Sequence, residues 1–81
     1  MSVGELLAHA RVARGLTLQD LSEATKLRVS ALDAMEHDDF RHCGGTAYVR
    51  GQLRSLAPML GLDPDELISA YYQDRRRTHA A

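Results

Sequence analysis

The chain has 81 residues, of which 44% are hydrophobic and 26% charged, and its formal net charge is −1. This length allows one domain with one hydrophobic core, and the composition is that of a folded chain. The single cysteine, Cys43, excludes an internal disulfide, and no run of residues approaches the roughly 18 apolar positions that span a membrane. The N-terminus lacks the layout of a signal peptide, so we expect a soluble, cytoplasmic chain.

The charges are unevenly distributed along the chain. Residues 1–40 carry a net charge of −3 and residues 41–81 a net charge of +2, which includes the run Arg75-Arg76-Arg77. Domains that bind nucleic acid through its phosphates are usually basic overall, so the composition does not favour DNA binding. The arginine run is compatible with a solvated tail, a phosphate-binding arm or a segment attracted to an anionic membrane surface.

The first half of the chain predicts three short helices. Ser2 and Glu5 have the spacing of a capping box, which begins the first helix. Thr17 and Asp20 repeat this spacing and begin the second. A short turn then leads into a third helix over about residues 28–37.

The second half predicts two more helices. Apolar residues at helical spacing indicate a fourth helix over residues 46–60. Asp63 and Pro64 then provide an N-cap and a first helical position for a fifth helix, which we expect to end near Tyr72. The sequence therefore predicts an all-α, five-helix domain over residues 1–72, followed by a basic segment over 73–81. That segment is expected to be a flexible tail or the start of a juxtamembrane linker.

The second and third predicted helices, from Thr17 and from Arg28, are separated by a turn of three or four residues, which is helix-turn-helix spacing. A small residue, Ser22, stands where the two helices would cross, and Lys26 stands where a glycine is usual. The alternative is an ordinary helical hairpin. The helix-turn-helix is favoured because every expected contact position is apolar, namely Leu18, Leu21, Leu27, Leu32 and Met35.

The stretch Gly15-Leu16-Thr17-Leu18-Gln19-Asp20-Leu21 resembles the phage-repressor (Xre-type) helix-turn-helix. Over about residues 2–72 the chain is similar to the N-terminal cytoplasmic domain of RodZ-type bacterial cell-shape proteins. The segments that carry this similarity are 24–32, 38–40, 48–56 and 61–67. The resemblance implies a compact phage-repressor-like fold that docks the actin-like filament protein MreB. It also implies a transmembrane helix beyond the basic segment, and hence a position at the cytoplasmic face of the inner membrane.

The fourth predicted helix offers a candidate protein-binding face. Tyr48, Gln52 and Ser55 share one side of it, and Arg50 and Arg54 form a second outward pair. A tyrosine beside arginines is a composition enriched in interface hot spots. The resemblance implies two aromatic contacts one turn apart, of which Tyr48 matches the first while Gln52 replaces the second. The alternative is that Tyr48 belongs partly to the core and the arginines are only solvated.

The third predicted helix is the alternative site, for nucleic acid. Its candidate residues are Lys26, Arg28, Val29 and Ser30. Only Arg28 is a strong base reader or phosphate ligand. Residues 28–39 have a net charge of −3, because Asp33, Glu36, Asp38 and Asp39 outnumber Arg28. We therefore favour a protein-docking module over an Xre-type DNA-binding regulator, since the fold alone does not decide the function.

Catalysis and metal binding have little support. His9, His37, His42 and Cys43 match no zinc-site spacing. The chain has no catalytic triad spacing and no phosphate-binding glycine loop, and Asp63, Asp65 and Glu66 are explained by helix capping. We therefore expect no enzymatic activity, no metal, no cofactor and no small-molecule substrate.

Overall fold

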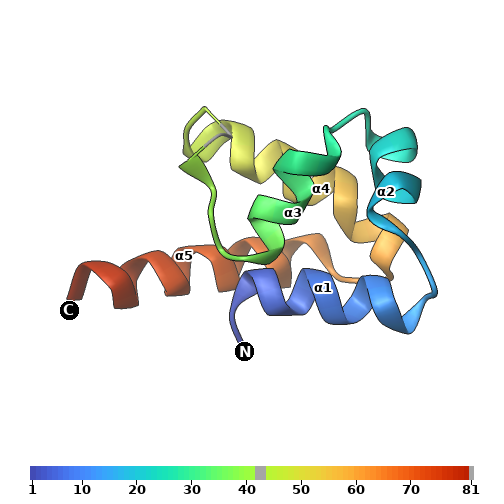
Figure 1. The fold of residues 1–81 in the computed structure, drawn as a ribbon. Helices are drawn as coiled ribbons and strands as arrows, with labels where there is room; N and C mark the ends of the chain where they lie inside the picture. Colours follow the sequence, from blue (N-terminus) through green and yellow to red (C-terminus); the bar gives the residue numbers. More distant parts are fainter. Residues whose placement is uncertain (42–43, 81) are drawn as a thin grey trace.

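The computed structural model describes residues 1–41 and 44–80, with the side chains of residues 77–80 left aside. This part of the chain contains five helices and no strand, which confirms the predicted all-α fold (Figure 1). The helices are α1 (Val3–Ala13), α2 (Leu18–Thr25), α3 (Val29–Glu36), α4 (Thr46–Leu60) and α5 (Pro64–Ala80). In Figure 1, α1 and α5 run along the bottom of the molecule, and α2, α3 and α4 lie above them.

Local hydrogen bonds define where the first two helices begin. The Ser2 hydroxyl accepts from the Glu5 N–H at 3.2 Å, and the Glu5 carboxylate accepts in return from the Ser2 N–H at 3.0 Å. Thr17 and Asp20 form the same reciprocal pair at 3.0 and 2.8 Å. Both predicted capping boxes are therefore present, and each satisfies two N–H groups that a helix start leaves unpaired.

One continuous hydrophobic core joins all five helices. Tyr71 closes one end of it and meets the half-buried Phe40 edge-on, with 5.0 Å between the ring centroids. Each large apolar side chain buried in this way stabilises the fold by roughly 1.5–3 kcal/mol. The buried core residues are Val3, Leu7, Leu21, Leu32, Met35, Val49, Leu53, Leu56, Ala57, Leu60, Leu67, Ile68 and Tyr71.

Two polar contacts hold α3 against α1. The Gly4 N–H donates to the Asp38 carboxylate at 2.8 Å, just beyond the end of α3. The Arg11 guanidinium makes a two-pronged bond to the Glu36 carboxylate, at 2.7 and 3.1 Å. Both contacts lie toward the C-terminal end of α3. The N-terminal end of α3 is left at the surface, beside α2 and α4 (Figure 1).

The fifth helix is longer than the sequence predicted. We expected it to end near Tyr72, but α5 continues to Ala80. Residues 73–80 contain neither glycine nor proline, so nothing in them breaks a helix. The extension is also held in place, because the Asp74 carboxylate accepts from the Val3 N–H at 2.7 Å and the Arg75 guanidinium lies 5.5 Å from the centre of the Tyr71 ring. The division of the chain at residue 72 and the juxtamembrane role of residues 73–81 stay predictions.

None of the helices in the described ranges combines the length and the hydrophobicity that a bilayer-crossing segment requires.

Candidate partner-binding face

The turn between α2 and α3 is built without a glycine. Lys26 ends α2 in the left-handed conformation, with a φ of 66°, and its N–H donates to the Ser22 carbonyl at 2.8 Å. The Thr25 hydroxyl donates to the Leu21 carbonyl at 2.7 Å. The position at which the motif usually takes glycine is thus occupied by a strained lysine. This geometry brings α2 and α3 together as a helix-turn-helix.

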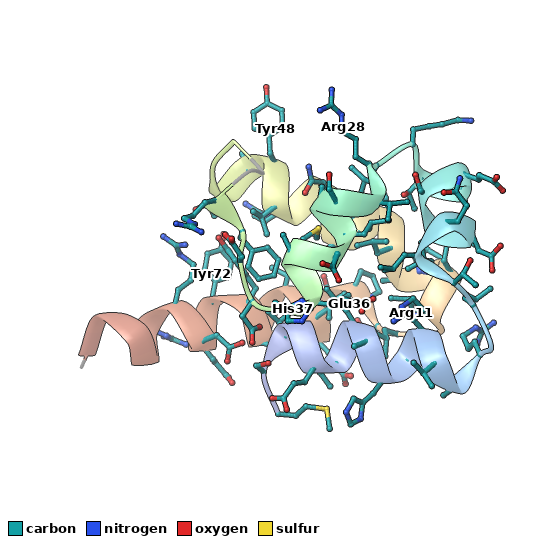
Figure 2. All side chains as sticks on the ribbon, viewed as in Figure 1. Arg11, Arg28, Glu36, His37, Tyr48 and Tyr72 are labelled. Carbon is teal, nitrogen blue, oxygen red and sulfur yellow. The ribbon has the colours of Figure 1, made fainter. Side chains whose placement is uncertain are left out.

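The four nucleic-acid candidates lie together at this turn and the start of α3. Lys26, Arg28, Val29 and Ser30 are all exposed. Arg28 is the N-cap residue of α3, but its side chain makes no capping bond, and in Figure 2 it projects away from the body of the molecule. This surface can therefore contact a ligand without any loss of internal bonds.

Most of the acidic residues counted over residues 28–39 lie at or just beyond the C-terminal end of α3, away from its exposed start. Glu36 is bonded to Arg11. Asp38 accepts from the α1 backbone, and Asp39 pairs with Arg41 at 2.9 Å. Glu36 and Asp38 thus bond to α1 at the far end of the helix, and Asp39 forms a local surface ion pair with Arg41. The negative charge counted over residues 28–39 therefore lies mostly away from the start of α3, and the exposed Asp33 stays as the objection to DNA binding.

His37 ends α3 with its ring beside Asp33. Its Nδ1 lies 2.8 Å from the Asp33 carbonyl oxygen and 3.7 Å from the Asp33 carboxylate. The hydrogen bond to the carbonyl, followed by the nearby carboxylate, raises the pKa of His37 above its usual value of 6.5.

A shallow groove runs between the α2–α3 turn and the exposed side of α4. Its volume is about 230 Å³. Tyr48 borders it with 67% of its surface exposed, and Figure 2 shows Tyr48 and Arg28 projecting from the same side of the molecule. We call this surface the α4 groove; it is lined by Thr25, Leu27, Ala47, Tyr48, Gly51, Gln52 and Ser55.

Three of the five predicted partner-binding residues line the groove, and the other two lie outside it. Tyr48, Gln52 and Ser55 line it, whereas Arg50 and Arg54 are exposed outside it. The nearest acidic group to Arg54 is on α5, with 3.8 Å between its Nη2 and the Asp65 carboxylate. Thr25 and Leu27 also line the groove, and the helical spacing of the sequence did not indicate them. Only the packing of α2 against α4 brings them there, and no periodicity within either helix reveals that packing.

Gln52 carries the one buried side-chain oxygen or nitrogen without a hydrogen-bond partner among the described residues. This atom is Oε1, and the side chain as a whole is half-buried in the groove. Buried polar atoms in native proteins are almost always bonded, so an unbonded one at a surface groove is a feature that a ligand could satisfy.

A second cleft, of about 470 Å³, lies between the start of α1, residues 38–41 and α5. The carboxylates of Asp38 and Asp74 at its edge accept hydrogen bonds from the Gly4 and Val3 N–H groups. These groups serve to assemble the fold. The part of the chain that the structure describes contains no group of three or more potential metal ligands, and His42 and Cys43 lie outside it.

Comparison with known proteins defines the class of this chain. Residues 6–67 match the model of a family described as a helix-turn-helix domain. The chain belongs to this family, and the helix-turn-helix predicted from the spacing of its residues is confirmed.

The particular relatives confirm the RodZ-type resemblance. The chain is 36% identical over 70 residues to the cytoskeleton protein RodZ of Streptococcus pneumoniae, which is 86% of this chain and 25% of that protein. It is 33% identical over 64 residues to the uncharacterized membrane protein YmfM of Bacillus subtilis, covering 79% of this chain and 22% of that protein. The chain therefore spans about a quarter of the length of these curated relatives.

A solved structure extends the comparison to three dimensions. YmfM of Staphylococcus aureus, described as a candidate DNA-binding membrane protein, superposes with a TM-score of 0.80 at 29% sequence identity. The match covers 90% of this chain and 89% of that one. None of these descriptions names an enzymatic activity.

Proposed function

We propose that this chain is a RodZ-like helix-turn-helix module that docks a partner protein through the exposed side of α4. The partner class is an actin-like filament protein of the MreB kind, or another cell-shape or cell-division protein. The observation that carries the proposal is the exposure of Tyr48 at the edge of the α4 groove. The similarity to RodZ, named a cytoskeleton protein, supports the partner class.

Tyr48 has the properties of an interface anchor. A tyrosine buries a large contact area while it immobilises only two side-chain bonds, so it loses little entropy on binding. Two small residues, Ala47 and Gly51, line the same groove and allow a partner to approach the helix closely. Arg50 and Arg54, outside the groove, form the polar rim of the proposed interface.

DNA binding is the second candidate, and a specific observation favours it. Three of the acids that argued against it are bonded within the fold, and Lys26 and Arg28 are exposed at the start of α3. The YmfM structure, described as a candidate DNA-binding protein, points the same way. Against it, Val29 and Ser30 offer weak base-reading chemistry, and a duplex bound along α3 would have to accommodate the protruding Tyr48.

A position at the membrane is part of the proposal. The YmfM relatives are described as membrane proteins. We place this domain at the cytoplasmic face, with the basic end of α5 toward an anionic surface. Arg75 and Arg76 are exposed there, and the side chain of Arg77 lies outside the described set.

The docking proposal is tested by co-sedimentation with filaments of the actin-like protein encoded by the same genome. Tyr48→Ala should weaken binding at least tenfold. Tyr72→Ala is the matched control, because Tyr72 is a partly exposed tyrosine on another helix, α5. Equal binding by the wild type and Tyr48→Ala would remove the α4 face from the proposal.

The DNA candidate is tested by a mobility-shift titration with genomic duplex fragments at low salt. Binding that falls steeply with added salt and is lost in Arg28→Ala would support a DNA-binding regulator. The docking proposal instead predicts no shift for the wild type.

A further inference from the structure

The α4 groove has a cationic border, and this border limits what can occupy it. Lys26 and Arg28 flank the groove residue Leu27 and are exposed. Neither forms an ion pair within 4.0 Å among the described residues. Two cations without an ion-pair partner, at the edge of a groove of mixed polar and apolar lining, attract a ligand that carries negative charge beside an apolar group.

Gln52 adds a hydrogen-bonding group to the lining of the groove. In the free protein the buried Gln52 Oε1 receives no hydrogen bond, which costs free energy. The last side-chain torsion of glutamine is broad and two-fold, so the amide can turn toward the groove. A bound chain with an N–H or O–H group at this point would then satisfy it.

The apolar part of the groove favours a protein side chain over a nucleic-acid backbone. The groove has a volume of about 230 Å³. The wall formed by Leu27, Ala47 and the Tyr48 ring is apolar, so expelling water from it with an apolar side chain is favourable. A DNA backbone could pair with the two cations, but it has no apolar group that fills the groove.

From these three features we infer that the α4 groove receives an acidic segment of the partner protein. One apolar side chain of that segment fills the groove, its carboxylates pair with Lys26 and Arg28, and a donor group bonds the Gln52 amide. This inference rests on the proposed docking function and adds the turn between α2 and α3 to the interface. It also explains why Gln52, in place of an aromatic residue, stands one turn after Tyr48.

The inference is tested by photo-crosslinking in cells that express the whole protein. A photoreactive phenylalanine at Ala47, which is exposed and lines the groove, is the probe, and the same residue at Gln73 on α5 reports background. Adducts are digested and the captured peptides are read by mass spectrometry. We expect peptides rich in Asp and Glu from a single protein, and at least a fivefold lower yield in Arg28→Glu.

Arg14→Glu is the matched charge control, because it reverses an exposed arginine at the end of α1, outside the groove. It should leave the yield unchanged. Arg28→Glu is expected to fold, since the Arg28 side chain makes no capping bond and a negative charge suits the start of a helix. Gln52→Leu should raise the melting temperature of the free protein and still lower the yield. If Gln52 had only a structural role, its replacement would not raise the melting temperature and lower the adduct yield at the same time.

The results of this experiment can contradict the acidic-segment inference without contradicting the proposed docking through α4. Loss of the adduct in Tyr48→Ala but not in Arg28→Glu would overturn the acidic-segment inference and leave α4 docking in place. An adduct that neither substitution changes would overturn both. Captured peptides that are neutral or basic, or an adduct that nuclease removes, would also overturn the inference.

Discussion

At the scale of single residues, the bond between Arg11 and Glu36 is the least exposed ion pair among the described residues. The two side chains are only 19% and 9% exposed, and the pair is two-pronged. Arg11→Ala leaves the Glu36 carboxylate shielded from water and unpaired. We expect it to lower the free energy of unfolding by about 2–3 kcal/mol, measured by urea denaturation.

Arg11→Lys provides the informative comparison. Lysine keeps the positive charge but cannot form the planar fork, so we expect an intermediate loss of about 1 kcal/mol. An Arg11→Ala protein as stable as the wild type would show that the pair contributes nothing net to folding.

The left-handed conformation of Lys26 makes a second prediction at this scale. A residue with a Cβ is strained at a φ of 66°, and glycine is not. We expect Lys26→Gly to stabilise the domain by about 0.5–1 kcal/mol in thermal unfolding. Lys26→Val, with a branched Cβ, should destabilise it. A destabilised glycine variant would mean that the lysine side chain contributes more than its backbone strain costs.

The titration of His37 is the third prediction. Because its folded-state pKa is raised above 6.5, its contribution to stability is fully present below pH 6.5 and is lost as the pH rises through the raised value. NMR titration of the imidazole should give a midpoint above 6.5. Asp33→Asn should lower that midpoint while the bond to the backbone carbonyl still holds it up. A midpoint at or below 6.5 in the wild type would contradict the observed geometry.

At the scale of elements, α1 and α3 approach each other through Gly4. A Cβ at this position would lie 2.6 Å from the Glu36 carbonyl oxygen and 2.7 Å from the Asp38 carboxylate. We therefore expect Gly4→Ala to cost about 1–3 kcal/mol in urea denaturation. Gly51→Ala is the matched control. Its Cβ meets nothing within 4 Å in the middle of α4, so it should stabilise the protein by about 0.5–1 kcal/mol.

Features set by neighbouring residues could be predicted from the sequence. The capping boxes at Ser2 and Thr17 and the left-handed Gly61 that ends α4 depend on contacts within a few positions. The length of α5 could not be predicted, because the Asp74 bond that supports it reaches 71 positions along the chain to Val3. Local pattern therefore predicted the end of α4 at Leu60 but not the end of α5.

For the candidate site, too, only the features that depend on neighbouring residues could be predicted from the sequence. Helical spacing placed Tyr48 and Ser55 on one side of α4 correctly. It could not show that Leu27 also lines the groove, or that Glu36 bonds to Arg11 in α1. Both depend on how one helix packs against another, and counting charges along α3 therefore overstated the acidity of its exposed end.

At the scale of the whole molecule, acidic and basic residues have different roles. Glu36, Asp38 and Asp39 make internal contacts at the end of α3 that faces α1. Lys26 and Arg28 stand unpaired at the other end, beside the α4 groove. A chain of net charge −1 thereby presents a basic surface next to an exposed tyrosine. In the proposed function this surface is where an acidic protein partner docks.

Amide chemical-shift mapping of the isotope-labelled protein tests this central claim most directly. When the actin-like protein from the same genome is added, we expect shifts confined to residues 25–28 and 47–55. When a genomic duplex is added instead, we expect no shifts. Shifts at residues 28–33 on adding duplex, with residues 47–55 unmoved by the filament protein, would contradict protein docking through α4.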